Sequence, residues 1–492
     1  MAEVLQLLHE LFGFIGRYII LIDIIFAIII VFFERRDPKV VWAWLLLMYF
    51  IPILGFILYL IIGMNIYKNR MFKLKEVEEN LNAAVKVQED AIKNKKYKEN
   101  QSDIKRHPDL AVYNLESSGA VMTFDNDVKI FTDGREKFDS LINDIRNAKH
   151  FIHFQYYIIR DDELMAEIAK ELIKKAEEGV KVRILYDAMG CRSTKRKFFK
   201  NLNSHENISV GEFFPAWFRH LHVRINYRNH RKIVVIDNEI AYVGGFNVGR
   251  EYLGKDKRFG YWRDTHLRIR GTAAVMLNLR FILDFNYATK EDVMNDEAVL
   301  YYPEDDSFTG NVDIQIISSG PDSTLQNIRN NYLKLINGAK RSIYIQTPYF
   351  IPDEALHSAL LIALHSGVEV NIMIPCKPDH PLVYWATYSY FGDLLKAGAN
   401  CYTYDNGFLH AKGVVVDDEL LCYGTANMDI RSFALNFEVN ALIYDKDIAK
   451  EMVRLFKEDV KLSTKVELSD YLKRNAWFRF KEQFCRLFSP LL

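Results

Sequence analysis

The chain has 492 residues, of which 49% are hydrophobic, 13% aromatic and 26% charged. This composition excludes a disordered chain and is enough for two or three domains with sizeable cores. Its 64 basic residues equal its 64 acidic ones, so no overall charge points to nucleic acid or to an acidic tail.

Two apolar runs open the chain, at 12–33 and 41–63, separated by a short turn that contains ERRDPK. Each is long enough to cross a hydrocarbon core of about 30 Å as a helix. A cleaved signal peptide has one shorter apolar core, so residues 1–66 are predicted to form a two-helix transmembrane hairpin that stays in the cell membrane. Lysine and arginine are slightly more numerous beside its outer ends than in its turn, which favours a cytoplasmic catalytic region.

A polar, charged segment at 67–110 follows and is predicted to be a linker. The remainder divides into two similar halves, 111–310 and 311–492. Residues 141–159 parallel 332–350, each predicted as a helix entering a strand, and an amphipathic helix and an apolar strand follow in both halves. Strand, helix, strand is a βαβ unit, so the predicted fold class is α/β, with two tandem βαβ-rich repeats.

An octad of pattern HxKxxxxD occurs once in each half, as HRKIVVID at 230–237 and HAKGVVVD at 410–417. Each is predicted to form a strand, a tight turn and a return strand, which ends in GGFN or GTAN. One such octad is expected by chance in about one chain in twenty, and two in only a few per thousand. The pair therefore indicates a function rather than two ordinary polar pairs on half-exposed strands.

The octads supply the candidate catalytic residues His230, Lys232, Asp237, His410, Lys412 and Asp417. Side chains alternate along a strand, so the His and Lys of each octad share one face. The Asp lies on the opposite face or in the turn, where aspartate commonly bonds backbone. We therefore expect each Asp to organise its hairpin rather than touch a substrate.

A mirrored set of His, Lys and Asn suits phosphodiester chemistry. Converging ammonium groups form an anion site, and Asn amides suit phosphoryl oxygens. Two histidines on opposite sides of phosphorus provide an in-line nucleophile and a general acid for the leaving oxygen. The sequence thus predicts one active site shared by both halves, with candidate phosphate-binding residues Lys232, Lys412, Asn247 and Asn427.

A catalytic histidine benefits from a carboxylate that orients it and stabilises its imidazolium form. Glu438 lies on an apolar strand downstream of His410, and Asp264 occupies the matching place in the first half. Both are candidate histidine-orienting residues. The alternative is that each forms a structural pair with a neighbouring arginine.

These features together resemble the bacterial cardiolipin synthases of the phospholipase D superfamily, which carry paired HxKxxxxD motifs. The resemblance rests on the N-terminal hairpin, on NHRKIVVIDNEIAYVGGFNVGREY and YWRDTHLRIRG, and on FLHAKGVVVDDELLCYGTANMDIRSFALNFEVN. It extends over nearly the whole chain. Thr425 stands where Ser is frequent, and it keeps the hydroxyl.

The resemblance implies that His230 attacks the phosphorus of one phosphatidylglycerol while His410 protonates the departing glycerol. The hydroxyl of a second phosphatidylglycerol, deprotonated by His410, then resolves a phosphatidyl-histidine intermediate and gives cardiolipin. Spacing alone does not decide which histidine attacks. No GxxxxGK[ST] loop and no acidic or Cys/His ligand cluster is present, so no cofactor and no metal are expected.

Two alternatives stay open: a phospholipase D-type hydrolase or other phosphatidyltransferase of the same superfamily, and an inactive membrane scaffold. Intact octads count against a scaffold. The hairpin and the neutral net charge count against a nuclease, so nucleic acid is not an expected partner. The expected partners are phosphatidylglycerol, cardiolipin and the bilayer. No motif fixes the acceptor alcohol, the acyl-chain preference or the oligomeric state.

Two segments mix aromatic and basic residues, 213–230 and 471–488. Such mixtures suit an interface with anionic lipid headgroups. The first runs directly into His230, which favours a role in lipid access. The second fits an ordinary domain surface or core helix equally well.

Overall fold

The computed structural model describes residues 106–489 apart from 216–226, 294–295, 297–307, 309, 324 and 378, together with 38–59, residue 88 and scattered positions before 38. The chain divides into two compact units, residues 1–71 with 216–227 and residues 72–215 with 228–492.

The smaller unit contains α2 (Pro38–Phe50) and α3 (Pro52–Leu58). The predicted apolar run at 41–63 is thus not one uninterrupted helix, because Pro52 lacks a backbone N–H and starts a new helix. Among the described residues, no helix combines the length and apolar character needed to cross a membrane. Much of the other predicted run, 12–33, lies outside the described residues.

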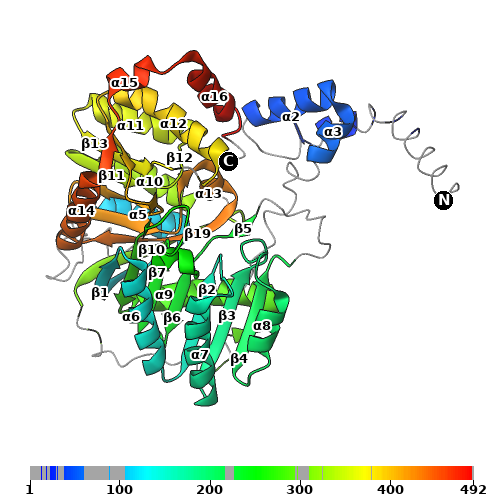
Figure 1. The fold of residues 1–492 in the computed structure, drawn as a ribbon, viewed down its shortest axis with the longest axis vertical. Coiled ribbons are helices and arrows are strands. Elements are labelled where there is room, and N and C mark those ends of the chain that lie inside the picture. Colours follow the sequence, from blue (N-terminus) through cyan, green and yellow to red (C-terminus); the bar gives the residue numbers. More distant parts are fainter. Residues whose placement is uncertain are drawn as a thin grey trace. The chain divides into compact units, whose positions relative to one another are not determined.

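The larger unit is built on one 16-stranded sheet (Figure 1). The first half supplies β1 (Met122–Phe131), β2 (Phe151–Tyr156), β3 (Lys181–Asp187), β4 (Ile208–Phe213), β5 (Arg228–Asn229), β6 (Ile233–Ile236), β7 (Ile240–Gly244) and β9 (His266–Arg270). The second half supplies β10 (Val312–Ser319), β11 (Ser342–Gln346), β13 (Glu369–Pro375), β14 (Asn400–Tyr404), β16 (Gly413–Val416), β17 (Leu420–Gly424), β19 (Asn436–Tyr444) and β20 (Ser463–Lys465).

The strand order repeats between the halves. It runs β1-β9-β7-β6-β2-β3-β4 in the first half and β10-β19-β17-β16-β11-β13-β14 in the second, where β20 adds an edge. β1 and β10 pair antiparallel and join the two halves into one sheet. Strand β5 lies off this path and pairs with β19 of the other half.

The predicted βαβ units are present in both halves. Helix α7 (Glu163–Glu177) connects the parallel strands β2 and β3, and α11 (Glu354–His365) connects β11 and β13. Asp162 and Asp353 cap these helices by accepting backbone N–H groups of the first turn. The predicted hairpins are the antiparallel pairs β6–β7 and β16–β17. The α/β class and the internal repeat are therefore confirmed.

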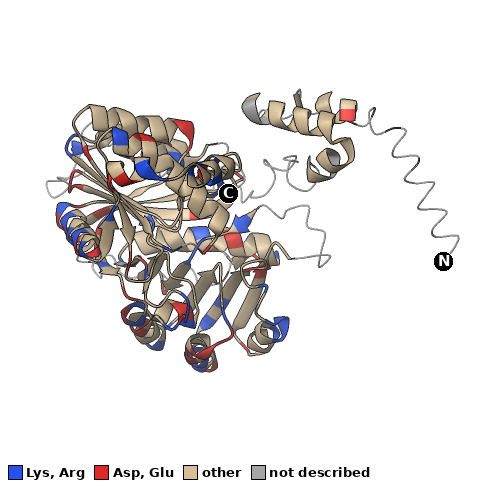
Figure 2. Cartoon of the chain, turned by 45° about the horizontal axis from the view of Figure 1, so that its top comes forward, with Lys and Arg blue, Asp and Glu red and all other residues tan. Residues whose placement is uncertain are grey.

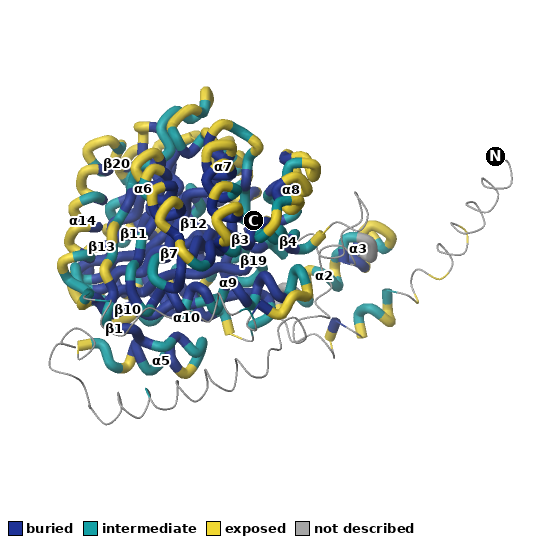
Figure 3. Tube along the Cα trace, turned by 90° about the horizontal axis from the view of Figure 1, so that it is seen from below, coloured by how far each residue is buried: buried dark blue, intermediate teal, exposed yellow. Residues whose placement is uncertain are grey.

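The remaining helices are α5 (Pro108–Ser118), α6 (Gly134–Asn147), α8 (Arg196–Asn203), α9 (Ala273–Thr289), α10 (Asn327–Gly338), α12 (Pro381–Lys396), α13 (Ile430–Ala434), α14 (Lys446–Lys461), α15 (Leu468–Lys473) and α16 (Ala476–Arg486). Short elements near the site are β8 (Trp262–Arg263), β12 (Phe350–Ile351), β15 (Phe408–Leu409), β18 (Met428–Asp429) and the 3-10 helix η3 (Arg250–Leu253). Charged residues gather on the outer helices in Figure 2, and the strands are mostly buried in Figure 3.

The core does not separate into one part for each half. One cluster joins buried residues such as Val235 and Leu267 of the first half to Val415 and Val439 of the second. Helix α5 begins at Pro108, inside the segment expected to be a linker, and packs against β10 and α10 of the second half. Each half therefore relies on the other for the burial of apolar surface.

Candidate active site

The two octads meet at one cavity of about 690 Å³. His230 follows β5 and precedes β6, and His410 follows β15 and precedes β16. Both imidazoles line this cavity, together with Asn247 and Asn427. The fold thus brings together side chains that the sequence separates into two halves.

The carboxylates reach the histidines across the halves. Glu438 of β19 accepts from Nδ1 of His230 at 2.9 and 3.1 Å, and Asp264, after β8, accepts from Nδ1 of His410 at 2.5 Å. Both predicted orienting residues therefore contact a histidine. Each one belongs to the opposite half from its histidine, which sequence order did not indicate.

Two short parallel pairings produce this exchange. β5 pairs with β19, and β15 pairs with β8. The backbone N–H of His230 then donates to the Phe437 carbonyl at 3.0 Å, and that of His410 to the Arg263 carbonyl at 2.7 Å. Each of these carbonyls belongs to the residue just before a carboxylate. The two backbone bonds therefore place each histidine beside the acid of the other half.

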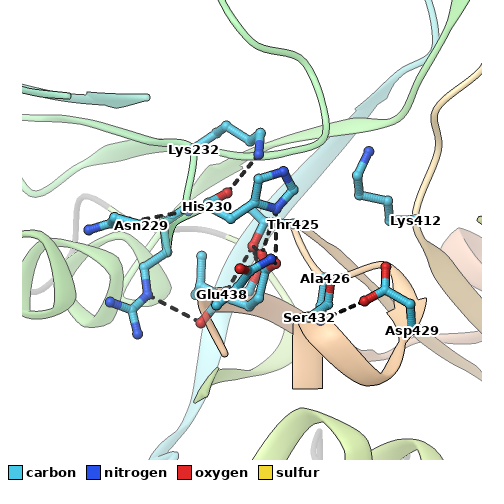
Figure 4. A network of polar contacts seen from close by, with 12 residues as sticks. Asn229, His230, Lys232, Lys412, Thr425, Ala426, Asp429, Ser432 and Glu438 are labelled. Atoms are coloured by element: carbon cyan, nitrogen blue, oxygen red, sulfur yellow. Dashed lines mark hydrogen bonds and ion pairs between the residues drawn. The ribbon is translucent and has the colours of Figure 1, made fainter. Parts of the chain in front are cut away.

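Both carboxylates are completely buried and have further donors. The Thr425 hydroxyl donates to Glu438 at 2.6 Å, and the Asn436 amide donates to it at 3.2 Å. Asp264 accepts the backbone N–H of Thr265 at 2.7 Å. Figure 4 shows the Glu438 contacts beside His230. These donors hold the two carboxylates in place. The sequence marked Thr425 only as a substitution for Ser and did not assign this contact.

The two lysines lie behind the histidines instead of on the cavity wall. Both are buried, and Lys232 Nζ donates to the His230 carbonyl at 2.6 Å. Lys412 Nζ lies 2.9 Å from Nδ1 of His410 and 3.8 Å from Asp264. Burial lowers the pKa of Lys232 to about 7 and that of Lys412 to about 8. Bound phosphate would raise both values again, because an opposite charge favours the ammonium form.

Burial favours the neutral form of both histidines. Burial lowers the pKa of His230, and it lowers the pKa of His410 to about 4. A neutral imidazole that donates through Nδ1 to a carboxylate carries its lone pair on Nε2. Each histidine can therefore act through Nε2 as a nucleophile or as a base.

The two asparagines differ in their contacts. Asn247 accepts the backbone N–H of Ile158 at 3.1 Å and donates to the Tyr252 hydroxyl at 2.7 Å. Asn427 has a buried side-chain oxygen that bonds to no partner among the described residues. Both lie on the cavity wall, where an amide group can reach a phosphoryl oxygen.

Asp237 and Asp417 lie outside the cavity. Asp237 accepts the backbone N–H groups of residues 149–151 at 2.7 to 2.8 Å, and Asp417 accepts those of residues 340–342 at 2.7 to 2.9 Å. Both have positive φ in their hairpin turns. Each ties its hairpin to the start of the neighbouring strand, β2 or β11, and contacts neither histidine.

Two buried clusters of polar side chains lie behind the site and were not predicted from the sequence. Gln155 and Arg231 donate to Asp284 at 2.8 and 2.7 Å, and Arg231 also donates to the Glu438 carbonyl at 3.2 Å. In the matching cluster, Gln346 of the second half and Arg263 of the first contact Asp459 at 2.8 and 2.7 Å. One sequence signal could have identified these clusters: Gln155 matches Gln346 in the repeat. These clusters hold the segments that cross between the halves.

Comparisons with known proteins give matches over most of the chain. Residues 141–258 and 332–460 match a family model described as "Cardiolipin synthase, PLD-like domain", and residues 21–63 match one described as "Phospholipase_D-nuclease N-terminal". The chain is 51% identical to the major cardiolipin synthase of Bacillus subtilis over 476 residues, covering 96% of this chain and 98% of that protein. It is also 51% identical to a cardiolipin synthase of Staphylococcus aureus over 484 residues, covering 97% of this chain and 96% of the relative.

A solved structure supports the fold alone. The phosphatidylserine synthase of Haemophilus influenzae aligns with a TM-score of 0.56 at 16% sequence identity, covering 74% of this chain and 93% of that one.

Proposed function

Because the chain belongs to the cardiolipin synthase family of the phospholipase D superfamily, we propose that it joins two phosphatidylglycerol molecules into cardiolipin and releases glycerol. The observation that carries the proposal is the pair of histidines on one cavity, each held at Nδ1 by a buried carboxylate of the opposite half. Two oriented Nε2 atoms are what a two-step transfer at phosphorus requires.

In the first step, Nε2 of His230 attacks the phosphorus of one phosphatidylglycerol. Glu438 stabilises the positive charge that grows on this imidazole. The anionic phosphate raises the pKa of His410, which then protonates the departing glycerol oxygen. Lys232 and Lys412 supply positive charge from behind the histidines, and Asn247 and Asn427 donate to the phosphoryl oxygens.

In the second step, His410 is the base. The hydroxyl of a second phosphatidylglycerol attacks phosphorus, its proton passes to Nε2 of His410, and the bond between phosphorus and His230 breaks. One phosphodiester replaces another, so no activated nucleotide is needed. A hydrolase of the same superfamily would follow the same path with water as the attacking molecule.

The direct test is to incubate the detergent-solubilised full-length protein with phosphatidylglycerol alone and to quantify lipids and glycerol by mass spectrometry. We expect cardiolipin and glycerol in equal amounts, and neither product with the His230→Ala variant. Phosphatidic acid as the main product would make the protein a hydrolase. Unchanged phosphatidylglycerol would favour an inactive scaffold.

We further propose that the protein is a cell-membrane enzyme whose N-terminal hairpin spans the bilayer twice, with a cytoplasmic catalytic region. The match of residues 21–63 to an N-terminal family model supports this proposal, as do the apolar runs themselves. Of the aromatic segment at 213–230, residues 216–226 lie outside the described residues.

Exposed side chains on helix α16 support the proposal that the protein contacts a lipid surface. One of its faces exposes Trp477, Phe480, Phe484 and, just beyond its end, Leu487, with exposed fractions of 60, 57, 47 and 75%. Lysine and arginine side chains lie on the same helix. Exposed aromatic side chains next to cations favour the headgroup region of an anionic bilayer.

The position of α16 connects this face to the cavity. α16 packs along α12 (Figure 1), and the first turn of α12 includes Val383, which lines the cavity. A lipid that leaves a bilayer beneath α16 therefore has a short path to the histidines.

The triple variant Trp477→Ser/Phe480→Ser/Phe484→Ser tests this contact. We expect turnover of phosphatidylglycerol in vesicles to fall about 5- to 10-fold, because the loss of three apolar anchors weakens interfacial binding. Turnover of a short-chain, monomeric phosphatidylglycerol should stay unchanged. Ile362→Ser, on the exposed face of α11, is the matched control, since Ile362 is 61% exposed. Equal losses on both substrates would contradict a docking role.

A further inference from the structure

The residues around the two histidines break the symmetry of the catalytic groups. Two positions before its histidine, the first half has Arg228 and the second has Phe408. Two positions before its acid, the first half has Trp262 and the second has Asn436. Five positions after its Asn, the first half has Tyr252 and the second has Ser432.

The strand exchange gathers the three aromatic members of these pairs around His410. The ring centroids of Trp262, Phe408 and Tyr252 lie 5.7, 6.0 and 6.2 Å from that of His410. Trp262 also lies 4.7 Å from Phe408 and 5.1 Å from Tyr252, so the three rings form one wall. Trp262 and Tyr252 line the cavity, while Phe408 is completely buried behind them.

Of the polar members of the same pairs, Arg228 and Asn436 lie on the side of His230, because β5 pairs with β19 and Asn436 donates to Glu438 at 3.2 Å. Arg228, Asn436 and Ser432 all line the cavity. Among the described residues, Tyr157 is the aromatic side chain in contact with the His230 ring, at 4.9 Å. The reaction cavity thus has an apolar side at His410 and a polar, cationic side at His230.

We propose that Tyr252, Trp262 and Phe408 form an acceptor subsite that seats the glycerol carbons of the attacking lipid and keeps water from Nε2 of His410. These residues would determine whether phosphatidyl-His230 is resolved by a lipid hydroxyl or by water. The inference rests on the proposed function and assigns the basis of its acceptor specificity.

Attack by a lipid hydroxyl and attack by water form and break the same kinds of bond in the phosphatidyl-His230 intermediate. The attacking O–H gives its proton to Nε2 of His410, a P–O bond forms, and the P–N bond to His230 breaks. A lipid hydroxyl gives cardiolipin, whereas water gives phosphatidic acid. Apart from the Trp262 indole N–H and the Tyr252 hydroxyl, which accepts from Asn247, this wall consists of ring surface. Ring surface offers water no strong hydrogen bonds, while the carbon skeleton of glycerol packs against it at no such cost.

The experiment compares Trp262→Asn, which copies the residue of the other half, with Trp262→Leu, which also removes the ring but stays apolar. Phosphatidylglycerol is supplied in ¹⁸O-labelled water, and the ratio of labelled phosphatidic acid to cardiolipin is measured. This ratio depends only on how the shared intermediate is resolved, so neither the first step nor the amount of folded protein changes it.

We expect Trp262→Asn to raise the ratio about fivefold over Trp262→Leu, equivalent to about 1 kcal/mol between the two competing barriers. Ser432→Ala, which changes a cavity residue outside the aromatic wall, should leave the ratio unchanged. If Trp262→Asn turns over with the wild-type ratio, the proposed subsite is wrong while the proposed function stands. If Trp262→Asn gives no turnover, Phe408→Leu, which opens space beside His410, replaces it, and an unchanged ratio counts equally against the subsite. Absence of cardiolipin from the wild-type protein would instead overturn the proposed function.

Discussion

His230→Ala is expected to abolish covalent capture of the lipid, whereas His410→Ala is expected to capture one lipid per active site and then stop. The test uses a phosphatidyl ester of p-nitrophenol, a leaving group that needs no proton. His410→Ala should then release about one p-nitrophenol per active site in a burst, followed by turnover about 10²- to 10⁴-fold slower than wild type, because the second step lacks its base. Rapid-mixing absorbance measurements separate the two phases.

The burst assigns the roles that spacing alone does not decide. The variant that lacks the nucleophilic histidine should show no burst and no phosphatidyl adduct in the intact-protein mass spectrum. The reverse result, with a burst in His230→Ala and none in His410→Ala, would make His410 the nucleophile. Wild-type thermal unfolding midpoints in both variants would show that folding is not the cause.

The exchange of carboxylates predicts a second, equally large pair of effects. Glu438→Gln should behave like the loss of His230, with no burst because the slowed first step limits turnover, and Asp264→Asn like the loss of His410, with a normal burst and slow turnover. Each should cost about 10³- to 10⁴-fold in the affected step, because a neutral amide neither stabilises imidazolium nor holds the same tautomer. Adding Glu438→Gln to His230→Ala should cause no further loss, since the two residues act as a unit.

Glu251→Gln is the matched control for these carboxylate variants. Glu251 lines the same cavity but contacts Arg160 instead of a histidine. Its loss should change either phase by no more than a few-fold. Exchanged phenotypes, in which Asp264→Asn removes the burst and Glu438→Gln spares it, would show that each acid serves the histidine of its own half.

Local patterns in the sequence were sufficient to predict the repeat, its βαβ units and its octad hairpins. The octads and their return strands are continuous in the chain, and alternation and turn residues specify such hairpins locally. The same spacing located His230, His410, Asn247 and Asn427, which the structure places on one cavity. Their chemical roles stay predictions until the variants are measured.

The exchange between the halves could not be predicted from the sequence. β5 and β15 have two residues each, too few for any periodicity, and their partners β19 and β8 are distant in the chain. Arg231 was missed because its match in the second half is Ala411, so the repeat gave no signal there. The burial of Lys232 and Lys412 behind the histidines also follows from the packing of both halves and not from their strand position.

The late position of β19 in the chain has a consequence during protein synthesis. The ribosome completes His230 long before Glu438, and β19 must insert between β17 and β10 in the middle of the sheet to deliver that carboxylate. An unfinished or C-terminally truncated chain therefore has a histidine without its acid and half of a cavity. Under the proposed mechanism, such a chain cannot cleave phospholipids until nearly the whole polypeptide has been made and folded.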